Sequence, residues 1–243
     1  MKRILPILIT LLLWLDLSCQ ICRIDTLNVR IGGTLNQSIQ TVLHFPIFRS
    51  ENGIIDSLIN TDIKNRFTKE DNTNLSIDSA LIKWELPQNF SIEFEVTYLS
   101  NEYLSLNISS YGCGAYCSTW IDYFTYSLKS GQYLTINDVI DTSGHFRELV
   151  ISDKNRQYEK QRGEIKLNLL NNQNEIDSSN YEWILESYNL CDSFFELNTF
   201  ALYPDHLEII DNCHLPSAIK YMSPIIELRY KYPDIRKYLK IKL

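Results

Sequence analysis

The chain has 243 residues, of which 44% are hydrophobic and 12% aromatic, so it is long and apolar enough to build a sizeable core. Its formal net charge is −7. Nucleic-acid binding requires clustered Lys and Arg to contact phosphates, so this charge balance argues against a nucleic-acid-binding protein.

The first residues are typical of an export signal. Lys2 and Arg3 precede an apolar run from Ile4 to Leu15, shorter than the ~20 residues of a membrane-spanning helix. We therefore interpret residues 1–18 as a signal peptide. Its end is similar to a bacterial lipoprotein signal, in which Cys19 would be lipidated and become the first mature residue. Ordinary cleavage that leaves a free secreted protein stays open.

Residues 19–87 predict a small N-terminal α+β part. Alternation predicts a strand ending at Ile31 and a second from about Ser38 to Phe45. Glu51–Phe67 predicts a helix with Ser50 as its N-cap. Apolar residues at steps of three and four would form its buried face: Ile54, Ile55, Leu58, Ile59, Ile63 and Phe67.

Residues 88–243 predict a larger C-terminal domain. Period-two patterns over 90–98, 103–111 and 119–128 predict an antiparallel meander. A helical stretch over 136–162, with Ser143 as a cap, comes next; 164–190 fits either helix or strand. The end predicts strands near 194–203, 207–211 and 225–230, and a short helix from Pro233. The expected fold is α+β, mainly antiparallel β-sheet with helices packed on one face.

Six cysteines are present, and the body of the chain holds Cys113, Cys117, Cys191 and Cys213. An exported chain favours disulfides, and local pairing joins Cys113 to Cys117 and Cys191 to Cys213, the second as a staple between neighbouring strands. Four cysteines allow three pairings, and a four-thiolate zinc site is the alternative. Cys22 would be left without a partner.

A family resemblance rests on the glycine–cysteine loop and the segments after it. The loop Tyr111-Gly112-Cys113-Gly114-Ala115-Tyr116 leads to the aromatic strand Tyr123-Phe124-Thr125-Tyr126-Ser127-Leu128, the turn Lys129-Ser130-Gly131 and the helix start Leu134-Thr135-Ile136-Asn137-Asp138. This order resembles the extracytoplasmic C-terminal domain shared by the anti-sigma factor RsiV and the peptidoglycan deacetylase PdaC. The first half, with Ile59-Asn60-Thr61-Asp62-Ile63, is similar to the domain that usually precedes it.

The resemblance implies an envelope module that recognises cell-wall material or a protein such as lysozyme. Tyr116 replaces the family's His, and Ser127 its Asp. The catalytic domain of PdaC and the sigma-binding segment of RsiV have no counterpart in this sequence.

No nucleophile elbow, His-Glu-x-x-His motif or phosphate-binding glycine loop occurs in the chain, so we expect neither cofactor nor metal. Glu93 and Glu95 are expected on a solvated strand face. The best candidate contact residues are Tyr111, Tyr116 and Trp120, which offer amphipathic rings, together with Asp122 between Trp120 and Tyr123.

The sequence thus predicts an exported protein of the bacterial cell envelope, lipid-anchored in the periplasm or outer membrane, or secreted. It would act as a noncatalytic binding module for peptidoglycan or a lysozyme-like protein. The alternatives are a cell-wall-directed hydrolase and a structural or accessory envelope lipoprotein. Convergent acidic or His side chains in a cleft would favour the hydrolase.

Overall fold

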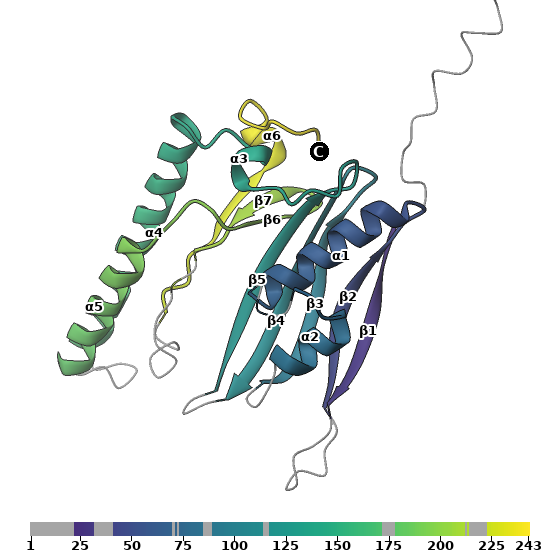
Figure 1. The fold of residues 1–243 in the computed structure, drawn as a ribbon. Coiled ribbons are helices and arrows are strands. Elements are labelled where there is room, and N and C mark those ends of the chain that lie inside the picture. Colours follow the sequence, from purple (N-terminus) through teal and green to yellow (C-terminus); the bar gives the residue numbers. More distant parts are fainter. Residues whose placement is uncertain are drawn as a thin grey trace, which may run out of the picture.

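A computed structural model describes residues 22–31, 41–69, 71, 73–84, 89–113, 117–171, 178–211, 213 and 223–243 (Figure 1). The expected signal segment, Cys19 and Tyr116 lie outside the described residues. The described elements are β1 (Arg23–Ile31), β2 (Thr41–Arg49), α1 (Gly53–Phe67), α2 (Ile77–Trp84), β3 (Asn89–Leu99), β4 (Tyr103–Cys113), β5 (Cys117–Ser127), α3 (Ile136–Val139), α4 (His145–Leu170), α5 (Ser178–Ser193), β6 (Phe200–Leu202), β7 (His206–Ile209), β8 (Leu228–Lys231) and α6 (Tyr232–Ile235).

The strands confirm the predicted α+β class and its antiparallel pairing. β1 pairs with β2, and β3, β4 and β5 form the predicted meander. β2 lies beside β3, and α1 and α2 cover one face of these long strands (Figure 1). The core beneath the helices takes side chains from β1, β2 and α1 as well as from β3, β4 and β5. It therefore crosses the boundary expected after residue 87.

Helix α1 corrects two expectations. Its N-cap is Asn52, whose side chain accepts hydrogen bonds from the backbone N–H groups of Ile54 and Ile55; Ser50 instead donates to Asp56. The predicted apolar face is also narrower than expected. Ile54 is 74% exposed and Leu58 50% exposed, while the other members are buried: Ile55, Ile59, Ile63 and Phe67.

A further sheet of shorter strands has the order β6–β7–β8 and packs with α3, α4 and α6 in its own core. Strand β6 packs against the β3–β4–β5 sheet, on the face of that sheet away from α1. There Ser105 hydrogen-bonds Thr125 and accepts the backbone N–H of Leu202. This contact joins the β6–β7–β8 sheet to the β3–β4–β5 sheet.

The C-terminal half contains more helix than expected. Residues 145–170 and 178–193 are helical, so the described part of the ambiguous stretch is almost entirely helix. The strand expected from residue 194 begins only at Phe200. The expected cap Ser143 hydrogen-bonds Asp141, and Gly144 is the N-cap of α4. Ile225 and Glu227 are not in a strand.

Glutamine side chains account for the late start of β8. Gln161 on α4 pairs with both backbone groups of Ile225, at 2.5 and 3.0 Å. Gln157, one turn earlier, does the same with Glu227, at 2.7 and 2.8 Å. Because the helix satisfies these backbone groups, strand pairing begins only at Leu228.

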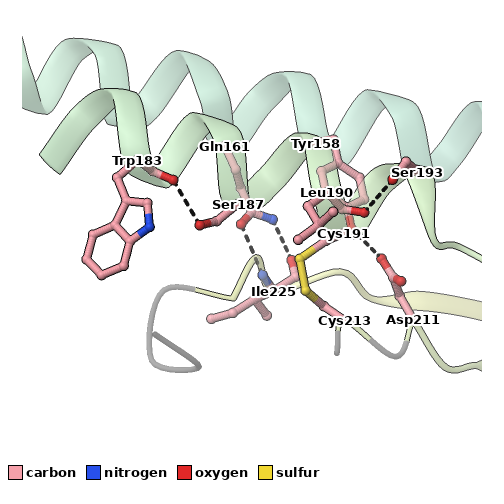
Figure 2. Close-up of a disulfide and its surroundings, with 10 residues drawn as sticks. All are labelled: Tyr158, Gln161, Trp183, Ser187, Leu190, Cys191, Ser193, Asp211, Cys213 and Ile225. Carbon is pink, nitrogen blue, oxygen red and sulfur yellow. Dashed lines mark hydrogen bonds between the residues drawn. A yellow bond between two sulfur atoms is a disulfide. The ribbon is translucent and has the colours of Figure 1, made fainter. Parts of the chain in front are cut away.

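Figure 2 shows the predicted Cys191–Cys213 disulfide, which is confirmed. It does not join two strands as expected. Cys191 lies on α5 and Cys213 lies beyond β7, so the bond ties the helical pair α4–α5 to the C-terminal sheet. Cys22 is also disulfide-bonded, so the expectation that it has no partner is wrong.

Candidate binding sites

The predicted contact residues do not share one surface. In the β4–β5 register Tyr111 pairs with Thr119, so both side chains lie on the face away from α1. Trp120 and Asp122 lie on the opposite face, because Asp122 pairs with Ile108, a residue of the core under α1. The structure therefore brings Trp120 and Asp122 together and separates them from Tyr111.

The glycine–cysteine loop closes the hairpin between β4 and β5. Cys113 and Cys117 face each other across the ladder and form the predicted disulfide. With Cys191 and Cys213 also bonded, these four cysteines do not form the alternative zinc site. Within the ranges that the structure describes, no three His, Cys, Asp or Glu side chains are grouped to hold a metal ion.

Asp122 lies in a shallow polar groove beside β5. The groove has a volume of about 210 Å³ and also borders Arg66, Tyr133, Asn198 and Thr199. Asp122 is exposed, yet partial burial of its carboxyl group in this concave surface raises its pKa, against the opposing charge of Lys69. Among the described residues, none forms a hydrogen bond or salt bridge with this carboxylate.

One wall of the groove is fixed by a network around Asp62. Tyr126 donates its hydroxyl proton to Asp62 at 2.8 Å, and Arg66 donates from Nε at 2.6 Å. The Arg66 guanidinium lies 3.8 Å from the centroid of the Tyr133 ring. Burial and the Asp62 charge raise the pKa of Tyr126, which keeps its proton on the hydroxyl. Arg66 and Tyr133 are thus held in place without a ligand.

A much larger open cleft lies at the start of α1, with a volume of about 1340 Å³. Its walls are the first turn of α1, the β3–β4 turn and the end of β5, and Lys242 from the C-terminus completes it. The lining residues are Ser50, Glu51, Asn52, Gly53, Ile54, Ile55, Tyr98, Ser100, Asn101, Glu102, Leu128, Lys129 and Lys242. Segments distant in sequence therefore form one concave surface.

The cleft combines apolar and charged groups. Ile54 projects into solvent, and Leu128 is buried at the wall. Lys129 pairs with Glu102 at 2.5 Å, whereas Lys242 makes no ion pair with a described residue. Sequence reasoning missed this site because it assigned Ile54 to the core. At about 100° per residue, the six predicted core residues span roughly 220° of the helix, wider than one apolar face, and Ile54 and Leu58 lie at one end of that span; this was the available signal.

Carboxylates are spread over the fold. Glu93 and Glu95 are exposed on the outer face of β3, as predicted; Asn107 donates to Glu95 at 3.0 Å. Burial raises the pKa values of Asp122 and Asp211, but Asp211 accepts from Tyr158 on α4 while Asp122 borders the β5 groove. These two carboxyl groups therefore do not form the facing pair that glycoside hydrolysis uses.

The histidine at the start of β7 also has local partners. His206 stacks on Tyr203 with ring centroids 4.6 Å apart and approaches Asp205 at 2.7 Å. Nearby, Arg229 pairs with Glu208 at 3.2 Å. The contacts of His206 lie within the β6–β7 hairpin, and the Arg229–Glu208 pair joins β7 to β8. His214 lies outside the described residues.

Comparison with known proteins identifies the fold. No protein-family model and no curated protein matches the chain. A solved DUF3298-family structure from Bacteroides fragilis superposes with a TM-score of 0.59 at 12% identity, over 92% of this chain and 96% of that one. A DUF3298-family protein from Pseudomonas aeruginosa PAO1 gives 0.52 at 12% identity, over 90% and 94%. The chain has a DUF3298-like fold.

This similarity is consistent with the RsiV/PdaC-type domain expected from the sequence, and at 12% identity it concerns the fold alone. The disulfides indicate that the folded part lies outside the cytoplasm. No helix among the described residues is long and apolar enough to span a membrane.

Proposed function

We propose that the protein is a noncatalytic binding module of the cell envelope and that it holds its ligand in the cleft at the start of α1. The observation that supports this is the size and position of the cleft, about 1340 Å³ between segments distant in sequence. Ligand sites are usually concave, largely preformed and lined by apolar groups with a few polar ones. Ile54, Tyr98, Lys129 and Lys242 supply such a mixture.

The ligand that we propose is a peptidoglycan fragment. Its peptide stems carry carboxylates, which would suit Lys242 and the positive end of the α1 dipole. Its sugar and peptide surfaces would lie against Tyr98 and the exposed Ile54. The resemblance to RsiV adds a lysozyme-like protein as the alternative partner.

Binding to purified muropeptides, measured by titration calorimetry, tests the proposal. We expect Ile54→Ser and Lys242→Ala each to weaken binding about three- to tenfold. Ile82→Ser is the matched control, because Ile82 is 42% exposed on α2 and does not line the cleft. Equal affinity of all three variants and the parent would place the ligand elsewhere.

A parallel titration with lysozyme separates the two ligands. Retention of lysozyme alone, weakened by Ile54→Ser, would replace the glycan by a protein partner in the same cleft. Release of new reducing ends from peptidoglycan by the parent would instead support the hydrolase. If neither ligand is retained, the accessory role gains support.

We further propose that Cys19 anchors the protein to the membrane through a lipid. Because the other four cysteines pair with one another, this proposal requires that the mature protein lacks the disulfide bond of Cys22. Intact-mass measurement of the mature protein under non-reducing conditions decides this. Lipidation adds the mass of the acyl chains to a chain that begins at Cys19. A mature chain without them would mean a free secreted protein.

A further inference from the structure

The outer edge of β5 is only partly occupied. The backbone C=O of Thr125 accepts the N–H of Leu134 at 2.7 Å, and the N–H of Ser127 donates to the C=O of Gln132 at 2.9 Å. Backbone groups of alternate residues point to the same side of a strand. Those of Ile121 and Tyr123 therefore point to this same edge, away from β4.

The edge becomes open where the chain turns away. Residues 132–134 run antiparallel beside β5 through the bridge between Tyr126 and Tyr133, then leave toward α3. Beyond that point, no hydrogen bond joins the outward backbone groups of Ile121 or Tyr123 to any part of the chain that the structure describes. The groove of about 210 Å³ runs along this stretch.

The side chains along the edge alternate in character. Ile121, 45% exposed, lies with Tyr123 on the face away from α1. Asp122 lies on the other face; among the described residues it forms no salt bridge, although the charge of Lys69 acts on its carboxylate. A strand added to this edge would place its own residues in register, apolar beside Ile121 and Tyr123 and cationic beside Asp122.

We propose that the β5 edge at residues 121–123 binds an extended segment of a partner protein as an added antiparallel strand. The segment would carry a Lys or Arg opposite Asp122, between two apolar residues. Main-chain hydrogen bonds would supply affinity, and the alternating side chains would supply specificity. The site is separate from the cleft at the start of α1 and does not depend on the ligand proposed there.

The probe for a direct test is the capped peptide Ser-Thr-Val-Lys-Val-Thr-Ser. Binding is followed by NMR, together with hydrogen exchange of the Ile121 and Tyr123 amides. We expect saturable binding and at least tenfold slower exchange of both amides. The same peptide with both Val nitrogens methylated loses two donors and should not bind. Equal binding of the methylated peptide would overturn strand addition.

Three variants test the edge and its charge. Ile121→Pro removes an outward N–H, which an edge strand tolerates, and should weaken binding about three- to tenfold, while Ile121→Val should not. Asp122→Lys should prefer the peptide with Glu in place of Lys by about two- to fivefold, reversing the preference of the parent. Circular dichroism confirms that each variant is folded.

Asp122 could instead protect the edge from pairing, as charged residues on edge strands do. In that case the Asp122→Ala variant would dimerise, and neither the Lys peptide nor the Glu peptide would bind the parent protein. That result would overturn the proposal. Ile54→Ser, which alters the cleft, should leave peptide binding unchanged, so the two sites can be tested independently.

Discussion

Asn60 on α1 satisfies both backbone groups of Phe48 on β2. The Phe48 N–H donates to Asn60 Oδ1 at 2.8 Å, and Asn60 Nδ2 donates to the Phe48 C=O at 2.9 Å. Two residues later, Asp62 accepts from Tyr126 on β5. The polar residues of this helix thus connect α1 to both groups of strands that it covers.

Replacement of Asn60 should destabilise the fold strongly. Asn60→Ala leaves the two backbone groups of buried Phe48 without partners, and each costs ~1–3 kcal/mol. We expect the free energy of unfolding to fall by about 2–4 kcal/mol in urea denaturation. The neighbouring exposed Thr61 is the control, and Thr61→Ala should change it by less than ~0.5 kcal/mol. Similar losses for both variants would contradict this role.

The two disulfides Cys191–Cys213 and Cys113–Cys117 should contribute unequally. The first spans a sequence separation of 22 and the second one of 4. Loop-closure entropy predicts losses of about 3 and about 2 kcal/mol when the respective pairs are changed to Ser. Denaturation of the two double variants under the same conditions measures the difference. A larger loss at residues 113 and 117 would show that native contacts outweigh chain entropy.

The aspartates near the Cys191–Cys213 bond should respond oppositely to pH. Burial raises the pKa of Asp211, although the hydrogen bond from Tyr158 lowers it. A carboxyl group with a raised folded-state pKa contributes stability at acidic pH, and that contribution is lost as pH rises through the folded-state pKa. Asp211→Asn should therefore gain stability relative to the parent between about pH 4 and pH 7.

Asp192 shows the opposite behaviour. Burial would raise its pKa, but hydrogen bonds and charges from Lys154 and Arg162 outweigh burial and lower it. Its contribution is present above the unfolded-state pKa and is lost as pH falls through the folded-state value. Asp192→Asn should therefore be least stable relative to the parent at neutral pH. Urea titrations from about pH 3 to pH 7 measure both variants, and parallel curves would refute the assignment.

Gly131 should not tolerate a side chain. Its φ is +71°, and an added Cβ would lie 3.1 Å from the Cβ of Leu58. Gly131→Ala should cost about 1–2 kcal/mol, seen as a Tm lower by roughly 2–8 °C. At Gly53 an added Cβ would meet no atom within 4 Å, and the backbone is not left-handed, so Gly53→Ala should be neutral or slightly stabilising. Equal Tm values for Gly131→Ala and the parent would show that the turn at Gly131 relaxes to accept the added methyl group.

Local patterns in the sequence were sufficient for much of the fold. The meander β3–β4–β5 follows from period-two alternation, and α1 from apolar residues at helical spacing, because both signals depend on neighbours in the chain. The pairings Cys113–Cys117 and Cys191–Cys213 were also predicted, since short separations favour local disulfides in an exported chain. The DUF3298-like fold agrees with the family expected from the glycine–cysteine loop.

Tertiary packing decided the rest. Which isoleucine of α1 faces the core depends on the rotation of the helix against strands from the other half of the chain. The backbone of Ile225 pairs with Gln161 rather than with a strand because α4 lies beside it. Strand parity separates Tyr111 from Trp120, and the β5 edge opens at Ile121 because residues 132–134 leave β5. These outcomes depend on contacts between residues distant in sequence, which local periodicity does not encode.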